Sequence, residues 1–344
     1  MKAVFFDRHG GPDVLQEGDV PTPTPGPDEV IVEVKACALN HLDIWIRTGI
    51  PGITVPLPHI LGADVAGVID TVGSNVKDWK PRQKVVVAPG ISCGACPPCL
   101  AGNDHLCDKY DILGQQSNGG YAEYVKVPAN NLLPMPDRLS FEEAASIPLT
   151  YLTAWQLLVT NGNVQPGQTV LVHAGGSGLG IACIQIAKLK GARVLTTVGN
   201  AEKGKKALAL GADETIQYRD TDFQQEIMRI TNKGGVDLAI DHIGQETFEK
   251  SLMSVAKGGK LLTCGATSGR QIHFDLRPLF SRNITVIGTR MGRKSALKEV
   301  LPHIQTARLT PVIDSVHPLN HAPKAHQKME SRHLFGKIVL GVKS

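Results

Sequence analysis

The strongest constraint on the fold is the segment 168–200, which combines a short apolar strand, a glycine-rich turn, an apolar helix and a second strand. Residues 169–174 have the length and apolar character of a buried strand, and residues 181–189 are apolar on most sides. Gly191 stands where a glycine ends a helix. A strand that runs through glycines into a helix directs backbone N–H groups and the positive end of the helix dipole at one point. We therefore predict a turn that binds an anion such as a pyrophosphate.

The glycine pattern of this turn is that of a dinucleotide-binding motif with one departure. Its three positions hold Gly175, Ser177 and Gly180, so serine replaces the middle glycine. A glycine-rich turn that binds nothing is the alternative, but the strand before it and the helix after it favour the motif. The expected cofactor contacts in the turn are Gly175, Gly176, Ser177, Gly178, Leu179 and Gly180.

Length and composition indicate an ordinary globular chain of two domains. The chain has 344 residues, which exceeds the size of a usual single core. It has no apolar run of 18 residues and no charged-then-apolar N-terminus, so we expect neither a membrane span nor a secretory signal. The net charge of +4 is small and spread out, which gives little reason to expect nucleic acid. Seven cysteines, four of them within fifteen residues, favour a metal site in a reducing compartment, so cytoplasm is the expected location.

Changes from strand-like to helical sequence along the chain indicate the domain boundaries. The first 135 residues or so are strand-rich, with a half-buried strand at 29–35 after a proline-rich surface turn. Helical sequence begins at Ser140, where Glu143 completes a capping box. Four further strand-like runs follow the glycine turn, at 213–218, 236–244, 260–266 and 283–289, and helical patterns at 222–231 and 246–256 fit crossovers between parallel strands. A helix at 295–306 and a strand at 335–342 are expected to return to the first domain.

Taken together, these features resemble the medium-chain dehydrogenase/reductase superfamily over essentially the whole chain. The resemblance implies an α/β protein with a GroES-like β-rich catalytic domain and a Rossmann domain with a doubly wound parallel sheet. We expect the catalytic domain to comprise residues 1–149 and 292–344, with a cysteine lobe at 90–112, and the nucleotide-binding domain to comprise residues 150–291.

The lobe carries a complete set of metal ligands. Its cysteines, spaced C-x₂-C-x₂-C-x₇-C, are Cys93, Cys96, Cys99 and Cys107, and four thiolates can close a tetrahedral shell around Zn²⁺. The spacing resembles that of the structural zinc lobe of zinc alcohol dehydrogenases, which implies one structural zinc per subunit. An iron–sulfur cluster or free thiols are the alternatives.

The catalytic zinc ligands of those enzymes are replaced. By resemblance, the three ligand positions hold Asn40, Ala63 and Leu149, and neither an amide nor an apolar side chain supplies the imidazole or thiolate that zinc selects. We therefore expect no catalytic metal. The alternative is a metal site formed instead by His59 and Asp43.

The replacements resemble the quinone oxidoreductase branch, whose N-x-x-D-x-x-x-R-x-G pattern is matched by Asn40, Asp43, Arg47 and Gly49. This resemblance implies direct hydride transfer from a nicotinamide to a quinone or an α,β-unsaturated carbonyl. We expect Asn40 to lie at the nicotinamide and the substrate carbonyl, and Asp43 and Arg47 either to take part or to form a structural ion pair that orders the loop. The sequence does not choose the proton donor.

The second strand of the nucleotide domain bears on the choice of cofactor. Val198 stands where an acid would select NAD by bonding the ribose 2′-OH, so repulsion of a 2′-phosphate is missing. Asn200 and Lys203 can donate to such a phosphate, although a solvated helix face also explains Lys203. Tyr218 matches a tyrosine that covers the adenine ribose in quinone reductases. NADPH is therefore expected in preference to NADH.

The resemblance adds cofactor contacts from His41, Thr153 and Lys337, the last as a basic residue that reaches the phosphates. His242 follows a strand at a position typical of ligand contacts, where a packed histidine is equally expected. The alternatives to a quinone or enone reductase are a zinc-type alcohol or aldehyde dehydrogenase and a non-catalytic NADPH-binding protein. A homodimer or homotetramer is expected, with the strand at 283–289 as a candidate interface.

Overall fold

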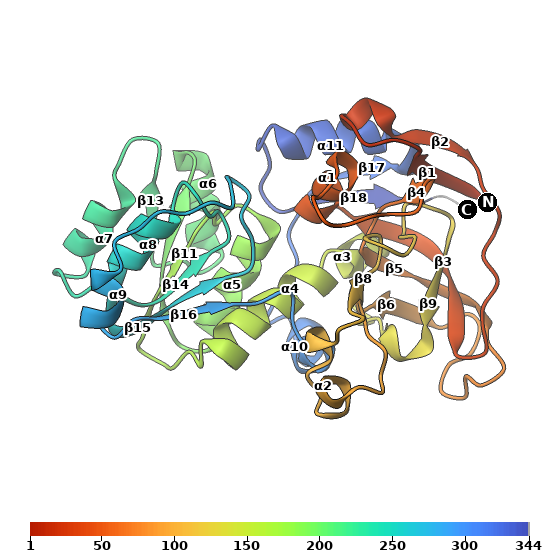
Figure 1. Ribbon diagram of the computed structural model, residues 1–344, viewed down its shortest axis with the longest axis horizontal. Coiled ribbons are helices and arrows are strands. Elements are labelled where there is room, and N and C mark those ends of the chain that lie inside the picture. Colours follow the sequence, from red (N-terminus) through yellow and green to blue (C-terminus); the bar gives the residue numbers. More distant parts are fainter. Residues whose placement is uncertain (343–344) are drawn as a thin grey trace. The chain divides into compact units, whose positions relative to one another are not determined.

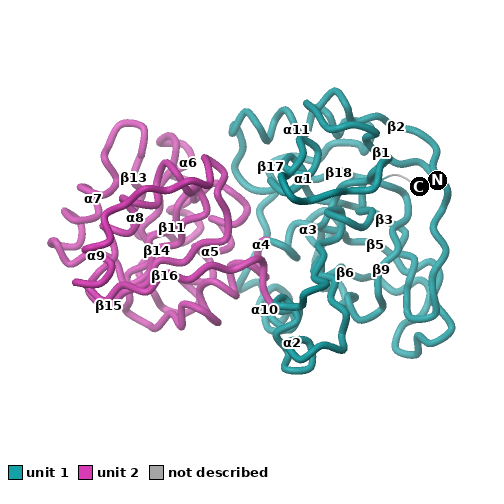
Figure 2. The backbone as a smooth tube through the Cα atoms, viewed as in Figure 1, with its two compact units in different colours: residues 1–149, 293–344 teal, residues 150–292 magenta. Residues whose placement is uncertain are grey.

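The computed structural model describes residues 1–342, and the chain divides into two compact units (Figure 2). The first unit comprises Met1–Leu149 and Arg293–Ser344, and the second comprises Thr150–Gly292. The first break falls inside helix α4 (Pro148–Trp155). The second falls one residue after the expected position.

The second unit is built on a six-stranded parallel sheet in the order β13-β12-β11-β14-β15-β16 (Figure 1). The strands are β11 (Thr169–Val172), β12 (Arg193–Val198), β13 (Glu214–Gln217), β14 (Val236–Asp241), β15 (Val255–Thr263) and β16 (Thr285–Gly288). Leu171, Leu195 and Leu261 are fully buried, as expected for a sheet covered on both faces. The order reverses direction between β11 and β14, which is the point where doubly wound sheets bind their ligands. The predicted Rossmann fold is confirmed.

Helices connect these strands and keep them parallel. They are α5 (Gly178–Leu189), α6 (Ala201–Ala209), α7 (Phe223–Ile230), α8 (Phe248–Ser254) and α9 (Arg277–Ser281), and a π-helical turn spans Gln156–Asn161 after α4. The two predicted crossover helices are α7 and α8. Helix α8 ends two residues before the predicted end, because Val255 already pairs with Val236 of β14.

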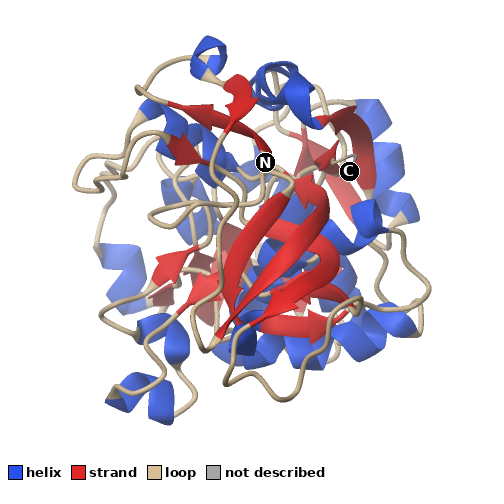
Figure 3. Ribbon diagram, turned by 90° about the vertical axis from the view of Figure 1, so that its right-hand side faces the viewer, coloured by secondary structure: helices blue, strands red, loops and turns tan. Residues whose placement is uncertain are grey.

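The first unit holds a seven-stranded sheet in the order β10-β6-β5-β3-β18-β17, with β9 paired to β3, and its long strands twist visibly in Figure 3. Its strands are β3 (Glu29–Ala38), β5 (Asp64–Val72), β6 (Lys84–Val87), β9 (Tyr124–Pro128), β10 (Leu132–Pro134), β17 (Ile313–Pro318) and β18 (Lys337–Gly341). A three-stranded sheet pairs β1 (Lys2–Phe6) with β2 (Gln16–Asp19) and β4 (His59–Ile60).

The end of the chain returns to the first unit as expected. Strand β18 pairs antiparallel with β3 and parallel with β17, and α10 (Ser295–Gln305) covers the predicted helix. Strand β17 and helix α11 (Ala322–Glu330) were not predicted. In β17 the residues are half-buried or exposed without alternation, so the sequence carries no strand period there.

Short elements complete the first unit. They are α1 (His41–Thr48), α2 (Pro97–Leu100), α3 (Phe141–Ala145), β7 (Gly90–Ile91) and β8 (Asp111–Ile112). Strands β7 and β8 pair antiparallel and close the base of the cysteine lobe. The predicted capping box opens α3, since the Ser140 hydroxyl accepts from the Glu143 N–H at 3.2 Å. Among the described helices, none has both the length and the apolar character needed to span a membrane.

Candidate active site and cofactor-binding turn

The glycine-rich turn lies between β11 and α5 in the second unit and has the geometry of a phosphate-binding turn. Ala174 adopts a left-handed backbone, with φ of 51°. The Ser177 hydroxyl accepts from the Gly180 N–H at 3.0 Å and caps α5. A Cβ at Gly175 would lie 2.3 Å from Thr196 Oγ1, and one at Gly180 would lie 2.2 Å from the Ala174 carbonyl oxygen. Only glycine therefore permits this close packing, and the turn fits a dinucleotide pyrophosphate.

The carboxyl end of β12 carries the residues expected to choose the nicotinamide. Asn200 caps α6, since its Oδ1 accepts from the Lys203 N–H at 2.9 Å. Tyr218 is 45% exposed just after β13. A Cβ at Gly199 would lie 3.4 Å from Tyr218 Oη and 3.9 Å from Arg219 Nε, so both side chains flank this turn. Arg219 was not predicted from the sequence, although its position beside Tyr218 directly after a strand was a usable signal.

Three further predicted cofactor residues are placed on separate elements. Thr153 is buried on α4, and His242 is buried directly after β14. His41 opens α1, with its ring centroid 5.0 Å from that of Trp45 in an edge-on arrangement. Burial, followed by the charge of Arg332, lowers the pKa of His41. Their contacts with a cofactor stay predictions.

A buried charged cluster occupies the part of the first unit that corresponds to the catalytic zinc site of zinc alcohol dehydrogenases. We call Asn40, Asp64 and Lys337 the Asp64 cluster; their exposed fractions are 7%, 0% and 4%. The Lys337 ammonium donates to the Leu39 carbonyl at 2.7 Å, to Asn40 Oδ1 at 2.7 Å and to Asp64 Oδ2 at 2.9 Å. All three of its N–H groups are therefore engaged. A cofactor phosphate, the partner predicted for Lys337, would have to replace one of these acceptors.

Asp64 joins the segments that contain the three expected ligand positions. Its Oδ2 accepts from Asn40 Nδ2 at 2.9 Å, and its Oδ1 accepts from the Leu149 N–H at 2.7 Å. Ala63, the third position, is its neighbour in the sequence. The alanine and leucine side chains have no donor atoms for a metal, and the carboxylate is bonded to an ammonium. This set of residues does not fit a catalytic zinc ion.

One N–H of the Asn40 amide remains weakly used. Nδ2 donates one hydrogen to Asp64, and its other contact is the Ala38 carbonyl at 3.5 Å, which is long for a hydrogen bond. Lys337 and Asp64 hold the amide from both ends, so its orientation is fixed before any ligand arrives. Asn40 thus presents a fixed amide donor at the N-cap of α1, two residues after β3 ends.

Asp43 acts on this site through the backbone. It is 2% exposed, and its carboxylate accepts from the Asn40 N–H at 2.7 Å and from the Gly62 N–H at 3.1 Å. Burial raises the pKa of Asp43 to about 7, against the opposing effect of the Asn40 N–H. The carboxyl group therefore positions Asn40 and the segment that leads to Asp64.

Arg47 lies 1% exposed and makes contacts away from Asn40. It donates through Nε to the Gly10 carbonyl at 3.1 Å, through Nη1 to His326 Nδ1 at 2.9 Å, and pairs with Glu330. The alternative that Arg47 forms an ion pair with Asp43 is therefore wrong. Burial, and then the charge of Arg47, lower the pKa of His326 to about 3, so its ring is neutral at neutral pH.

The neutral ring fixes the direction of a buried hydrogen-bond chain. Because a guanidinium only donates, His326 Nδ1 accepts from Arg47, and its Nε2–H donates to Tyr121 Oη at 3.1 Å. Neither Tyr121 nor His326 was predicted from the sequence. His326 lies on α11, whose buried face has only alanines beside it and no large apolar side chain to mark a helix.

His59, the other member of the alternative metal site, is engaged elsewhere. It lies 1% exposed in β4, with Nε2 3.0 Å from the Gly114 carbonyl oxygen and its ring edge-on to Phe6. Burial lowers its pKa. The histidine packs in the core of the first unit.

The four lobe cysteines converge. The sulfur atoms of Cys93, Cys96, Cys99 and Cys107 all lie within 4.8 Å of one another, with Cys96 and Cys99 at 3.4 Å and Cys93 and Cys99 at 3.9 Å. Sulfurs around a tetrahedral zinc lie about 3.8 Å apart, given Zn–S bonds of about 2.3 Å. The backbone N–H groups of Ala95 and Cys96 lower the pKa of Cys93 to about 6, whereas at Cys96 the lowering by the Cys99 backbone N–H is outweighed by burial and by hydrogen bonds among the sulfurs, which raise its pKa to about 12. The set fits a structural zinc ion.

Comparisons with known proteins cover both units. The family model described as "Alcohol dehydrogenase GroES-like domain" matches residues 26–137, and the one described as "Zinc-binding dehydrogenase" matches residues 178–306. A solved structure of an NAD-dependent alcohol dehydrogenase is 48% identical, with a TM-score of 0.97 and full coverage of both chains. The NAD-dependent alcohol dehydrogenase of Sulfolobus acidocaldarius is 32% identical over 99% of this chain and 100% of its own. The human quinone oxidoreductase is 29% identical over 99% of this chain and 97% of its own.

Proposed function

The chain belongs to the medium-chain dehydrogenase/reductase superfamily, and we propose that it is an NADPH-dependent reductase of quinones or α,β-unsaturated carbonyls that works without a catalytic metal. Like its relatives, it is an NAD(P)-dependent oxidoreductase. The proposal concerns the substrate class, the preferred nicotinamide and the absence of a catalytic metal. The name of the human relative agrees with quinone as a substrate.

The observation that carries the proposal is the Asp64 cluster. An ammonium, a carboxylate and an amide join the segments where zinc enzymes of the superfamily would place metal ligands. The remaining amide N–H of Asn40 can donate to a substrate oxygen that becomes negative as hydride arrives. A fixed donor of this kind suits the reduction of a conjugated carbonyl, where charge develops on the oxygen.

The bound nicotinamide supplies the hydride. The turn at 174–180 would hold its pyrophosphate, and Lys203, Tyr218 and Arg219 would surround the adenosine ribose. Arg219 adds a forked donor to the point charge of Lys203, and this favours a 2′-phosphate. We propose one structural zinc per chain in the cysteine lobe.

The decisive experiment measures oxidation of NADPH and NADH with a panel of quinones, enones and aldehydes, with and without a chelator. We expect NADPH to be preferred over NADH and quinones or enones to be reduced. We also expect activity to persist in the presence of a chelator, because the proposed reaction needs no catalytic metal. Asn40→Ala should lower kcat by about 10²–10³-fold, the usual cost of losing an oxyanion donor. A second zinc per chain that activity requires would overturn the proposal.

NAD-dependent alcohol oxidation is the second candidate, because two of the relatives above carry that name. It predicts reduction of NAD by primary or secondary alcohols and little turnover of quinones. The same panel, run in the oxidative direction with alcohols, distinguishes it.

We also propose a homodimer or homotetramer. Strand β16 is the last strand of its sheet, and Val286 on it is 40% exposed. Light scattering of the purified protein measures its molar mass and hence the number of subunits.

A further inference from the structure

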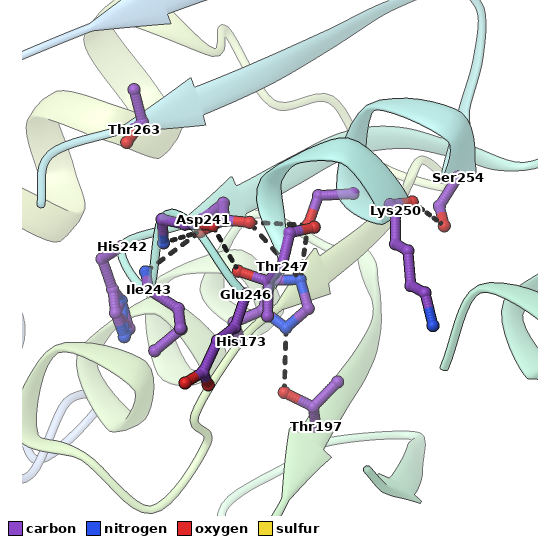
Figure 4. A network of polar contacts seen from close by, with 12 residues as sticks. His173, Thr197, Asp241, His242, Ile243, Glu246, Thr247, Lys250, Ser254 and Thr263 are labelled. Carbon is purple, nitrogen blue, oxygen red and sulfur yellow. Dashed lines mark hydrogen bonds and ion pairs between the residues drawn. The ribbon is translucent and has the colours of Figure 1, made fainter. Parts of the chain in front are cut away.

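A buried polar network lies under the glycine-rich turn of the second unit and takes no part in the chemistry proposed above (Figure 4). Its members are Thr197, His173, Ser251 and Asp241, with exposed fractions of 2%, 1%, 0% and 0%. His173 lies between Thr197 on one side and Asp241 on the other (Figure 4), and its Nε2 contacts Ser251 Oγ. A buried ionisable group of this kind requires partners on every side.

The hydrogen bonds of the network join the turn at 174–180 to the loop at 242–247 through strand β12 and helix α8. Thr197 Oγ1 accepts from the Ala174 N–H at 3.1 Å and lies 3.0 Å from His173 Nδ1. His173 Nε2 lies 2.8 Å from Ser251 Oγ, which donates to Asp241 Oδ2 at 2.6 Å. The other oxygen of Asp241 accepts from the Ile243 and Gly244 N–H groups at 3.0 Å each.

Protonation states give these bonds one direction. Burial lowers the pKa of His173, so the ring is neutral, while Asp241 is the charged group that faces it. Because Ser251 donates to the carboxylate, it accepts from His173 Nε2–H, and His173 Nδ1 then accepts from Thr197. The remaining face of the ring packs edge-on against Phe223, with centroids 4.8 Å apart.

The network spans the point where the strand order reverses. Ala174 follows β11, Thr197 belongs to the end of β12, and Asp241 ends β14. Dinucleotides bind in the crevice outside the carboxyl ends of these strands. The left-handed backbones at Ala174 and at Gly244, where φ is 91°, are thus both linked to one imidazole ring. The link to Ala174 runs through Thr197, and the link to Gly244 runs through Ser251 and Asp241.

We propose that His173 is a positioning residue for the dinucleotide, which locks the turn at 174–180 and the loop at 242–247 into one preformed binding surface. The proposal rests on the NAD(P) dependence stated above. A preformed surface binds more tightly because the ligand does not have to order the two loops. Breaking the network on the far side of the ring therefore weakens binding, although Ser251 belongs to α8 and not to the turn.

The test compares two buried serines of α8. Ser251 bonds the network, whereas Ser254, also 0% exposed, donates to the Lys250 carbonyl at 2.7 Å. Titration of protein fluorescence with NADPH and with NADH measures the dissociation constants, and thermal unfolding without ligand reports stability. Ser251→Ala should raise the dissociation constants about tenfold, as expected for a donor lost from a buried carboxylate. Ser254→Ala should leave them within about twofold, since no buried charge loses its partner.

Two further comparisons separate positioning from general destabilisation. Thr197→Val should weaken binding as Ser251→Ala does, and Thr197→Ser, which keeps the hydroxyl, should restore it. In a His173→Leu background, Ser251→Ala should cause a clearly smaller loss than in the wild type, because Ser251 then acts only on Asp241 and its link to the turn is gone.

Equal dissociation constants for Ser251→Ala and Ser254→Ala, or an undiminished Ser251→Ala effect in the His173→Leu background, would overturn the inference. If His173→Leu does not fold, the paired serine and threonine variants decide. A wild-type protein that binds neither dinucleotide contradicts the proposed function instead.

Discussion

The cysteine lobe and the Asp64 cluster are two groups of polar side chains in the first unit, and they differ in whether a metal is needed to balance their charge. The lobe gathers four sulfur atoms from a segment of fifteen residues, and its thiols are partly exposed except for Cys107. The cluster joins residues 24, 273 and 297 positions apart and buries an ammonium against a carboxylate. One set of side chains is left for a metal to complete, whereas the other is already closed by Lys337.

The difference has a physical basis. Four thiols crowded together repel one another once ionised, so a bound cation would stabilise the lobe. A buried ion pair with every N–H engaged requires none, but it fails badly when one partner is removed. The variants below test the two halves of this contrast in order of expected effect.

Loss of one lobe cysteine should have the largest effect. Structural zinc binds with an apparent free energy of about 10–16 kcal/mol, and removal of one thiolate takes away a quarter of its ligands. Cys99→Ser should lower zinc, measured by elemental analysis, from one per chain to well under half. Cys264→Ser, outside the lobe, should keep it. Iron in the wild-type protein would instead favour the cluster alternative.

Lys337→Met should be next. The variant leaves Asp64 buried and unpaired, which costs about 3–5 kcal/mol of unfolding free energy. Urea unfolding followed by circular dichroism measures it. Lys206→Met breaks the solvent-exposed pair with Glu202, which water screens, and should change the free energy of unfolding far less than Lys337→Met does. Similar losses for the two variants would show that the cluster does not carry a buried charge.

Asp43 should give the stability a pH dependence of known sign. Its pKa is about 7 in the folded chain and about 4 when unfolded, so the folded state binds more protons and stability falls as pH rises from 4 to 7. The three-unit difference sets an upper bound of about 4 kcal/mol. The stability of the wild type relative to Asp43→Asn should therefore decline across this range. A flat difference in urea midpoints between pH 4 and pH 7 would contradict the raised pKa.

Asn40→Ala should have the smallest effect on stability. It removes one acceptor from Lys337 and one donor from Asp64 but leaves the ion pair, at a cost of about 1–3 kcal/mol. The same variant should lower kcat by about 10²–10³-fold, so catalysis should suffer more than stability. Asn130→Ala, an exposed asparagine with a 3.4 Å contact to Lys294, is the matched control and should change neither quantity.

Local patterns predicted most of the fold because they involve neighbours in sequence. The glycine turn with its flanking strand and helix, the capping box at Ser140 and the cysteine spacing are short-range features, and the structure has each of them. Strand β17 escaped prediction because its burial does not alternate, and helix α11 because its buried face consists of Ala322, Ala325 and His326 and carries no large apolar side chain. His326 and Glu330, the partners of Arg47, were missed with them.

The sequence by itself determined the two-unit α/β architecture, the glycine-rich βα turn and the four-cysteine lobe, since glycine conformation, apolar period and cysteine spacing are properties of short segments. Only the tertiary structure decided what fills the place of the missing zinc ligands, and that Lys337 lies against Asp64 and Asn40. The reason is that a buried charge selects its partner by distance and desolvation. Residues hundreds of positions apart meet only when β18 inserts beside β3.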